Sequence, residues 1–257
     1  MTELFPILEF DPDRGAILNP DAFKANLSGP VPNVGVLCFF NEVLAEMAER
    51  GELKVLLHLG SEIGANPVYT YNVDGRDITV CHPGVGAPLA AGFMEELIAI
   101  GVTKFVVCGG CGVLNREIAA GHPVILTGAV RDEGTSYHYI PPSREVEPRG
   151  NVTRALIDTF TEAGLDFRVG KAWTTDALYR ETKGKRKARL EEGCEVVEME
   201  AAALFAVAQF REVSIGQVVY GGDLVVPEGW DSRSWANRGD DRRLLFDLSA
   251  KAARKLL

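Results

Sequence analysis

Residues 195–223 constrain the fold of this chain more than any other stretch. A short apolar run, 195–199, leads directly into the alanine-rich run 200–208, and a second apolar run, 215–220, is followed by two glycines and Asp223. The short runs have the length of buried strands, and the run between them is typical of a helix. In an open α/β sheet, ligands bind where the strands reach their carboxyl ends. The segment therefore predicts an α/β fold with acidic side chains at two such strand ends.

Two of these acidic residues, Glu198 and Glu200, lie at the first strand end. In an extended segment, residues two apart point the same way, so both carboxylates share one side and Met199 takes the other. Glu200 also lies near the start of the expected helix, where the positive helix end favours an ionised carboxylate. A fixed carboxylate suits the hydroxyl groups of a sugar. A simple excess of acidic residues at a helix N-terminus explains the same pattern equally well.

Strand-like runs and amphipathic helices alternate along the rest of the chain. We expect strands at residues 33–38, 55–59, 68–73, 77–81, 105–108, 123–127 and 168–173. We expect helices at residues 42–50, 88–100, 151–163 and from 242 to the end. Asp74-Gly75 is a hairpin signal, and Asn41 can cap the first helix. The alternation predicts a single-domain α/β fold in which helices flank a mixed β-sheet.

The N-terminal residues differ from the rest. Residues 1–32 contain five prolines and show no period. We expect them to form an irregular arm that packs on the outside of the domain or on a neighbouring subunit. The remaining residues, 33–257, are long enough for one large α/β domain.

The composition argues against several classes of function. The net charge of −9 is unfavourable for nonspecific binding to nucleic acid or to an anionic membrane surface. No apolar stretch approaches the roughly 20 residues of a membrane span, and no secretory signal is visible. Five cysteines, an odd number, are typical of a reduced protein in such a chain. We therefore expect a cytoplasmic protein.

The first glycine motif, Gly84-Val85-Gly86, follows an expected strand and precedes a helix. A dinucleotide-binding fingerprint would place a third glycine where this chain has Leu89. We therefore expect no nicotinamide cofactor. The motif predicts a tight turn at which the backbone can approach a ligand, and Pro88 suits the first position of the next helix.

The second glycine motif spans residues 109–112 and also follows a strand. It predicts either bare backbone against a ligand or a bend with positive φ. Cys108 and Cys111 have the spacing of a redox or zinc pair, but no second close pair of Cys or His accompanies them. We therefore expect neither metal nor redox chemistry.

Two polar stretches can be explained either by a structural role or by a functional one. The basic run 183–189 is expected to be the solvated face of a helix. The aromatic stretch 134–142 contains His138, which is either a structural residue or part of a ligand-facing loop. Tyr179 follows another expected strand and could stack on a flat ring.

Taken together, these motifs resemble the nucleoside phosphorylase family, in particular its uridine phosphorylase and hexameric purine nucleoside phosphorylase branch. The matching segments follow the family's order at residues 81–88, 109–112, 121–124, 132–141, 174–179 and 198–201. The resemblance implies a phosphorylase-like α/β fold. It also implies a pentosyltransferase that cleaves the N-glycosidic bond of a ribonucleoside with phosphate, giving free base and ribose 1-phosphate. The expected assembly is a homo-oligomer, a hexamer or a dimer.

The same resemblance implies roles for individual residues. The ribose would be held by Glu198, Met199 and Glu200. The base would be surrounded by Cys111, Gly112, Leu178 and Tyr179. Asp223 stands where purine-specific members carry the acid that protonates the base, a step that needs a general acid. His138 lies in a loop that could be shared between subunits.

The residues expected to bind phosphate depart from the family pattern. Residues 38–42 read Cys-Phe-Phe-Asn-Glu, where phosphate-using members carry a loop with glycine and arginine. Val107 replaces another arginine and Gly110 a threonine. Losing these cations is unfavourable for binding a phosphate dianion. The remaining candidates are Arg131, Arg144, Arg180, His82 and the backbone amides of Gly84, Gly86, Gly109 and Gly110.

These departures leave two alternatives open. A nucleosidase would use water instead of phosphate, and Glu42 lies one residue from the place where that branch carries a water-activating acid. A non-catalytic family member would bind a nucleoside without cleaving it. Thr182 and Gly184 replace the glutamine and arginine that read uracil, so uridine is not the expected substrate. No cofactor is expected beyond phosphate as a co-substrate.

Overall fold

The computed structural model describes residues 5–21, 27 and 29–257. Its strands are β1 (Val34–Cys38), β2 (Leu53–Ser61), β3 (Gly64–Val73), β4 (Arg76–Cys81), β5 (Lys104–Val113), β6 (Pro123–Asp132), β7 (Glu145–Val146), β8 (Arg168–Thr175), β9 (Cys194–Glu198), β10 (Ser214–Val226) and β11 (Gly229–Asp231). Its α-helices are α1 (Asn41–Glu49), α2 (Ala87–Ala99), α3 (Val152–Glu162), α4 (Lys183–Glu191), α5 (Ala201–Arg211) and α6 (Gly239–Arg254).

The strands form one mixed sheet that closes on itself at one end. The order is β11-β10-β6-β8-β9-β5-β1-β4-β3-β2, with β7 beside β6, and β10 pairs with β5 as well as with β6. Strands β10, β6, β8, β9 and β5 therefore form a ring, while β1 to β4 extend it as an open sheet. Parallel pairs such as β1–β5 and antiparallel pairs such as β5–β9 both occur. The predicted mixed α/β fold is confirmed.

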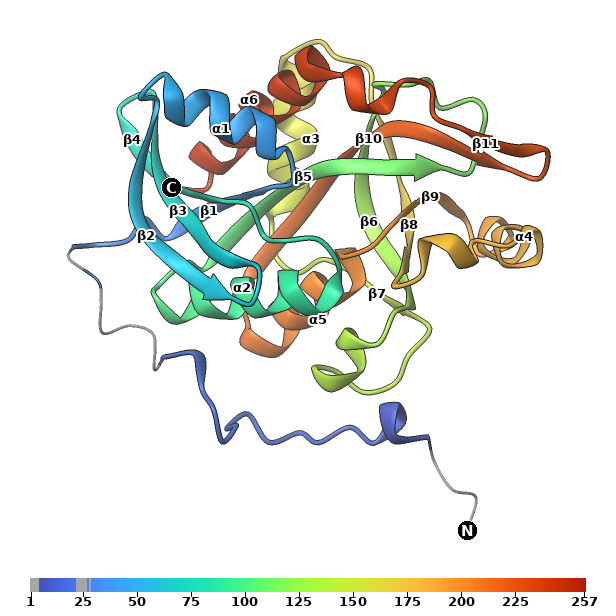
Figure 1. Cartoon of the computed structure of the whole chain (residues 1–257), viewed down its shortest axis with the longest axis horizontal. Helices are drawn as coiled ribbons and strands as arrows, with labels where there is room; N and C mark the ends of the chain where they lie inside the picture. Colours follow the sequence, from blue (N-terminus) through green and yellow to red (C-terminus); the bar gives the residue numbers. More distant parts are fainter. Residues whose placement is uncertain (1–4, 22–26, 28) are drawn as a thin grey trace.

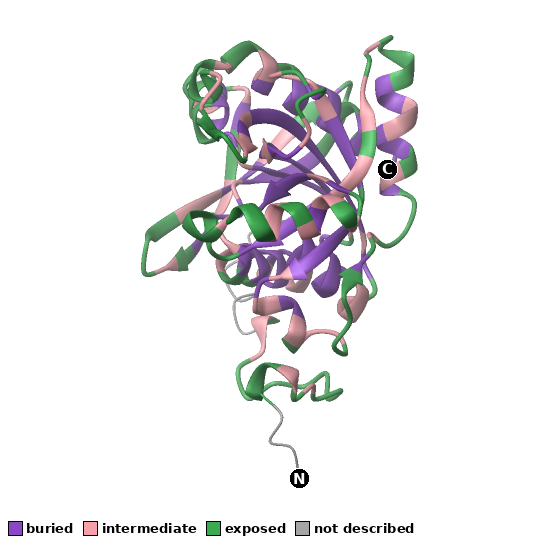
Figure 2. Cartoon of the chain, turned by 90° about the vertical axis from the view of Figure 1, so that its right-hand side faces the viewer, coloured by how far each residue is buried: buried purple, intermediate pink, exposed green. Residues whose placement is uncertain are grey.

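Helices cover both faces of this sheet (Figure 1). Helices α2 and α5 pack together on one face, and α3 and α6 pack together on the other, where α1 also lies. Alternate residues of a strand enter opposite layers, as the two-residue period of a strand requires. In β5, Val107 joins the cluster that contains α2 and α5, whereas Val106 and Cys108 join the cluster with α3 and α6. The buried strands run through the centre of the molecule and the helices expose their outer faces (Figure 2).

Several local predictions can be compared with the structure. Asp74 and Gly75 have φ values of 49° and 82° and connect β3 to β4, so the predicted hairpin is confirmed. The prediction of an Asn41 cap is wrong, because Phe40 holds the cap position and Asn41 is the first helical residue. The expected helix 151–163 matches α3.

The second glycine motif is not a bend. Residues 109–112 continue strand β5, and none of these glycines has a positive φ. A Cβ at Gly109 would lie 3.1 Å from the ring of Phe39, and one at Gly112 would lie 2.9 Å from Val197. The glycines therefore let neighbouring side chains pack directly against the strand.

The described part of the N-terminal arm includes a short 3₁₀ helix, Pro6–Leu8, and runs mostly irregularly along the body of the domain (Figure 1). Arg14 anchors it: the guanidinium pairs with Glu212 at 3.0 Å and lies over the ring of Phe210. Ile17 and Leu18 are exposed. The rest of the predicted arm, residues 1–4, 22–26 and 28, lies outside the described residues.

Candidate active site

The first acid of the β9–α5 corner, Glu198, holds the start of α5. Its carboxylate accepts the amide protons of Glu200 at 2.8 Å and Ala201 at 2.7 Å, and the hydroxyl of Thr174 donates to its other oxygen. Thr174 in turn accepts the amide of Ala202. Glu198 is buried, and burial raises its pKa. These bonds tie strand β8 to the first turn of α5 and fix the corner.

The second acid, Glu200, occupies the N-cap position of α5 and is 7% exposed. Its Oε1 accepts the amide proton of Gly86 at 2.6 Å. Burial, and then the nearby charge of Glu198, raise the pKa of Glu200 to about 8. The prediction that the helix end keeps Glu200 ionised is wrong, because Glu198 accepts the amides at that helix end. Met199 lies between the two acids and is half-buried.

The turn at Gly84 and Gly86 approaches this corner from the other side. Both glycines have positive φ, 80° and 90°, and a Cβ at Gly84 would collide with Leu89 at 2.4 Å. The amide of Gly84 donates to Nδ1 of His82 at 3.0 Å, and that of Gly86 donates to Glu200. Both amides, which were candidates for binding an anion, therefore have partners within the protein. Pro88 is the second residue of α2, one position later than predicted.

The third acid, Asp223, lies in β10 at a bulge between Gly221 and Leu224. Its Oδ2 would be 3.6 Å from a Cβ at Gly112, and Gly112 pairs with Val197, the residue before Glu198. Burial raises the pKa of Cys111, and the charges of both Asp223 and Glu198 raise it further. The structure therefore brings Asp223 and the β9–α5 corner to the same edge of the sheet, on either side of β5.

Leu178 and Tyr179 belong to a 3₁₀ turn, Leu178–Arg180, that follows β8. Leu178 is 48% exposed and Tyr179 is 92% exposed. The next residue after the turn, Glu181, was not singled out from the sequence; burial, and then the charge of Asp223, raise its pKa to about 7. Trp230 was also missed: its indole N–H donates to Oδ2 of Asp223 at 2.6 Å. No local pattern marks Trp230, because it reaches Asp223 only through the fold.

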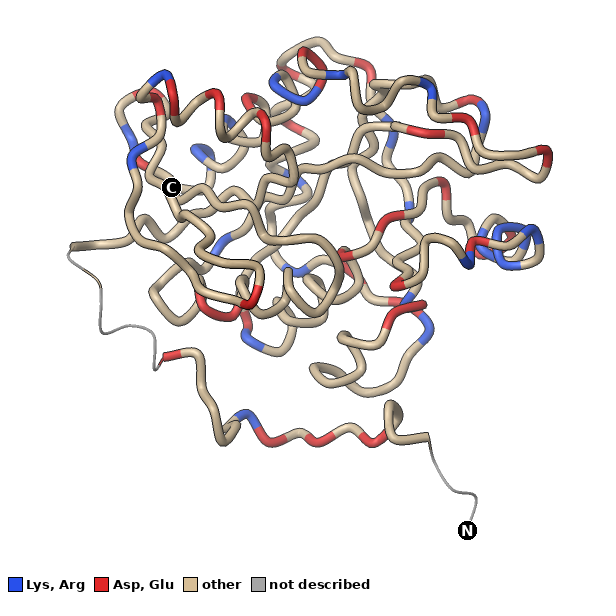
Figure 3. Tube along the Cα trace, viewed as in Figure 1, with Lys and Arg blue, Asp and Glu red and all other residues tan. Residues whose placement is uncertain are grey.

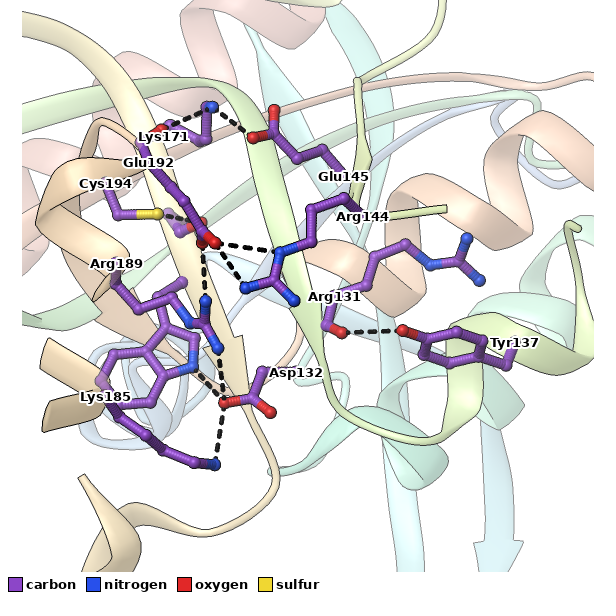
Figure 4. Close-up of polar contacts among 12 residues, drawn as sticks. Arg131, Asp132, Tyr137, Arg144, Glu145, Lys171, Lys185, Arg189, Glu192 and Cys194 are labelled. Carbon is purple, nitrogen blue, oxygen red and sulfur yellow. Dashed lines mark hydrogen bonds and ion pairs between the residues drawn. The ribbon is translucent and has the colours of Figure 1, made fainter. Parts of the chain in front are cut away.

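Two of the cations suggested for phosphate, Arg131 and Arg144, are engaged elsewhere. Arg131 is buried and lies over the ring of Tyr137, and its guanidinium donates to Ser136, Ile140, Pro141 and Ser143. Arg144 pairs with Glu192 (Figure 4). The carboxylate of Glu42, the candidate for activating water, is bound by Arg242. Arg180 is exposed.

The basic run 183–189 forms most of α4, where Lys and Arg gather at one side of the molecule (Figure 3). The prediction of a solvated helix face is confirmed for the helix and for Lys183 and Lys187, which are exposed, but it is wrong for Arg189, which is buried. Lys185 donates to Asp132 at 3.0 Å, and Arg189 is buried between Asp132 and Glu192 (Figure 4). Arg186 donates to the carbonyl of Val225 at 2.7 Å. These contacts fasten α4 to the sheet next to Asp223.

A cleft of about 760 Å³ lies between the N-terminal arm and the body of the domain. Its lining includes Pro88, Glu95, His138, Asp176 and Arg211, but neither Glu200 nor Asp223. His138 is thus placed beside the arm rather than between the acids. Among the described residues, no group of His, Cys, Asp and Glu side chains could hold a metal ion. Within the same part of the chain, no helix has the length and apolarity to cross a membrane.

Comparison with known proteins identifies the family. A model of the phosphorylase superfamily matches residues 33–255. The chain belongs to the phosphorylase superfamily. Within this superfamily, the chain is 33% identical over 145 residues to a guanosine phosphorylase of Halorubrum lacusprofundi, covering 56% of this chain and 60% of that protein. It is 32% identical over 162 residues to a uridine phosphorylase of Treponema pallidum, covering 59% and 63%. The match thus spans less than two thirds of these relatives.

Solved structures show a similar fold. The purine nucleoside phosphorylase of Toxoplasma gondii, in complex with immucillin-H, superposes with a TM-score of 0.76 at 20% identity, covering 88% of this chain and 92% of that one. An AMP nucleosidase of Bacteroides thetaiotaomicron superposes with a TM-score of 0.70 at 22% identity, covering 88% and 89%. At these identities the likeness concerns the fold.

Proposed function

We propose that this protein is a nucleoside phosphorylase-like enzyme that cleaves the N-glycosidic bond of a ribonucleoside with phosphate, giving free base and ribose 1-phosphate. The observation that carries the proposal is the placement of Glu200 and Asp223 at one edge of the sheet, on either side of β5. The matched relatives are named for phosphorolysis of guanosine and of uridine, which supports the proposed reaction class.

Different residues act on the ribose and on the base of the nucleoside. Glu200 and Met199 hold the ribose hydroxyls, while Glu198 keeps the corner in place. The bond from C1′ to the base nitrogen breaks, its electron pair leaves with the base, and a phosphate oxygen bonds to C1′. The sugar becomes oxocarbenium-like on the way, as in glycoside hydrolysis. Asp223 faces the base, where a proton or a hydrogen bond offsets the charge of the leaving group.

A nucleosidase is the second candidate, and the engagement of the cations favours it. Arg131 and Arg144 are both committed to protein partners, and the amide of Gly86 donates to Glu200. A phosphate dianion needs charge-assisted donors, whereas water does not. For phosphorolysis, the amides of Gly84 and Gly86 would have to exchange partners as phosphate binds. Glu42 is the proposed water-activating acid in the hydrolytic version, and it would first have to leave Arg242.

One assay separates these functions. The full chain is incubated with a panel of nucleosides in buffers with and without phosphate, and free base, ribose and ribose 1-phosphate are quantified. Phosphorolysis is expected to give ribose 1-phosphate and no turnover without phosphate. Equal turnover in both buffers, with ribose as the product, would identify a nucleosidase. Nucleoside binding without any cleavage would identify a non-catalytic binder and refute both enzymatic proposals.

We also propose a cytoplasmic homo-oligomer, a dimer or a hexamer. All five cysteines are free and buried, which fits a reducing compartment. The arm leaves Ile17 and Leu18 exposed, and His138 is exposed in the loop beside it. We propose that these residues contact a neighbouring subunit. Light scattering tests the assembly, and a monomer at micromolar concentration would refute it.

A further inference from the structure

Arg242 connects helix α6 to the carboxyl ends of three neighbouring strands. It is buried in the first turns of α6, and its Nε donates to Oη of Tyr220 in β10 at 2.9 Å. A terminal nitrogen of the guanidinium pairs with the carboxylate of Glu42, which follows β1. The ring of Tyr220 packs beside Gly110 of β5, where a Cβ would be 3.5 Å from the same Oη. Strands β1, β5 and β10 are parallel neighbours, so the guanidinium lies at the edge of the sheet that also carries Asp223.

Three aromatic rings and one carboxylate surround the guanidinium of Arg242. Its Cζ lies 5.6 Å from the ring centroid of Phe40, 5.7 Å from that of Tyr220 and 5.4 Å from that of Trp235. The second terminal nitrogen donates to the carbonyl of Trp235 at 3.0 Å. A guanidinium has about five N–H groups, so the bonds to Tyr220, Glu42 and Trp235 leave further donors for a ligand. The rings hold the guanidinium in place, and its fork of donors suits an oxyanion.

Glu42 is the exposed half of this ion pair. Its side chain is 52% exposed, whereas that of Arg242 is 10% exposed. A carboxylate that faces water can leave its partner at little cost, because water solvates it. The buried guanidinium has no such alternative, since a buried charge without a partner is costly. An anion from solution can therefore take the place of Glu42 and keep Arg242 paired.

The other buried arginines are held differently. Arg131 donates to side-chain hydroxyls and backbone carbonyls of its own loop. Arg189 lies between Asp132 and Glu192, and the side chain of each acid is only 25% exposed. Among the described residues, Arg242 is the buried arginine whose charge is balanced by one half-exposed carboxylate. It is therefore the buried cation that an anion from solution can reach most easily.

We propose that Arg242 binds an inorganic oxyanion at this edge of the sheet and that Glu42 is a built-in competitor, which the oxyanion displaces from the guanidinium. The inference rests on the proposed function, which needs a cation for phosphate although Arg131 and Arg144 are engaged elsewhere. The two states exclude each other. Either Glu42 pairs with Arg242 and the position is closed, or the oxyanion occupies Arg242 and Glu42 turns to water. The ion pair thus limits how tightly the protein binds its co-substrate.

The first test removes the competitor. Inorganic phosphate is titrated calorimetrically, at constant ionic strength, into the full-length wild type, Glu42→Gln and the control Glu46→Gln. Glu46 lies one turn later on α1 and pairs with Arg50 at the surface. Glu42→Gln is expected to bind phosphate at least about tenfold more tightly than the wild type, because the anion no longer has to displace a carboxylate. The control is expected to stay within about twofold of the wild type.

A gain in affinity separates this proposal from a purely structural role of the ion pair, because damage to the fold does not tighten binding. Phosphate affinity of Glu42→Gln equal to or below that of the wild type would overturn the proposal. So would the absence of measurable phosphate binding to both proteins.

The second test removes the cation. Arg242→Gln is expected to weaken phosphate binding by at least about tenfold, and Arg242→Lys, which keeps the charge but loses the fork, is expected to lie in between. The control is Arg243→Gln, since the neighbouring Arg243 pairs with Glu52 and Asp247. Wild-type phosphate affinity in Arg242→Gln would refute the assignment. Thermal unfolding checks that each variant is folded, and the Glu42→Gln result decides the question if Arg242→Gln does not fold.

Kinetics distinguish failure of this inference from failure of the proposed function. Free-base release is measured at varied phosphate and varied nucleoside concentrations. The KM for phosphate is expected to change in the same order as the calorimetric affinities, while the KM for the nucleoside changes little. If no protein cleaves a nucleoside but the calorimetric order holds, the proposed reaction fails and the anion site stands. If cleavage requires phosphate but its KM is the same in the wild type, Glu42→Gln and Arg242→Gln, the proposed function stands and this inference fails.

Discussion

Replacing Glu200 by glutamine should change how stability depends on pH. The pKa of this buried carboxyl is raised from 4.5 to about 8 in the folded protein, first by burial and then by Glu198. At a pH between 4.5 and about 8, Glu200 has lost its proton in the unfolded chain but keeps it in the folded protein. Folding therefore binds a proton in this range, and stability falls as pH rises. Each pH unit corresponds to about 1.4 kcal/mol, so Glu200 alone contributes a loss of roughly 2–3 kcal/mol between pH 5.5 and 7.5.

Glutamine has a similar shape but does not titrate. The free energy of unfolding of Glu200→Gln should therefore lack this pH-dependent contribution. The free energy of unfolding is measured in urea at several pH values for the wild type, for Glu200→Gln and for the exposed control Glu191→Gln. As the pH rises from 5.5 to 7.5, the free energy of unfolding of the wild type and of the control should fall by roughly 2–3 kcal/mol relative to that of Glu200→Gln. Parallel curves for the wild type and Glu200→Gln would show that Glu200 is ionised in the folded protein. That result would refute the reasoning about its burial.

Three other predictions concern the same edge of the sheet. Asp223→Asn should lower kcat by about 100-fold or more while nucleoside binding measured by calorimetry persists, since a general acid contributes about that much; an unchanged kcat would remove Asp223 from the mechanism. Thr174→Val should reduce the free energy of unfolding by about 1–3 kcal/mol, because Glu198 loses a buried hydrogen-bond donor. Urea unfolding measures this change, and an unchanged unfolding midpoint would contradict the structural role of the β9–α5 corner. Gly84→Ala should lower both the melting temperature and activity, because the new methyl group would meet Leu89 at a positive φ; wild-type values for both would contradict that.

Local patterns predicted the elements of this fold well. The hairpin at Asp74-Gly75 carries its own turn chemistry, and the buried strands are short apolar runs between glycines and helices. The same patterns could not show that β10 pairs with both β5 and β6, because that pairing joins residues about 100 positions apart. The closure of the sheet brings Gly112 to both Val197 and Asp223.

The candidate site was predicted only in part, because some of its contacts also join residues that are far apart in the sequence. Glu198, Glu200 and Asp223 stand at strand ends, which a sequence can indicate. The different roles of Glu198 and Glu200 depend on distances that the sequence does not show. Glu198, not Glu200, accepts the amide protons at the start of α5. Trp230 lies in a three-residue strand that no period marks, and it reaches Asp223 only because the hairpin folds back.

A structure of the protein with a bound, uncleaved nucleoside analogue tests the central claim most directly. We expect the ribose hydroxyls to lie within hydrogen-bonding distance of Glu200 and the base to lie beside Asp223 and Gly112, with β5 between the two ends of the ligand. An analogue bound elsewhere, for example in the cleft beneath the N-terminal arm, or one that contacts only one of the two acids, would contradict the claim.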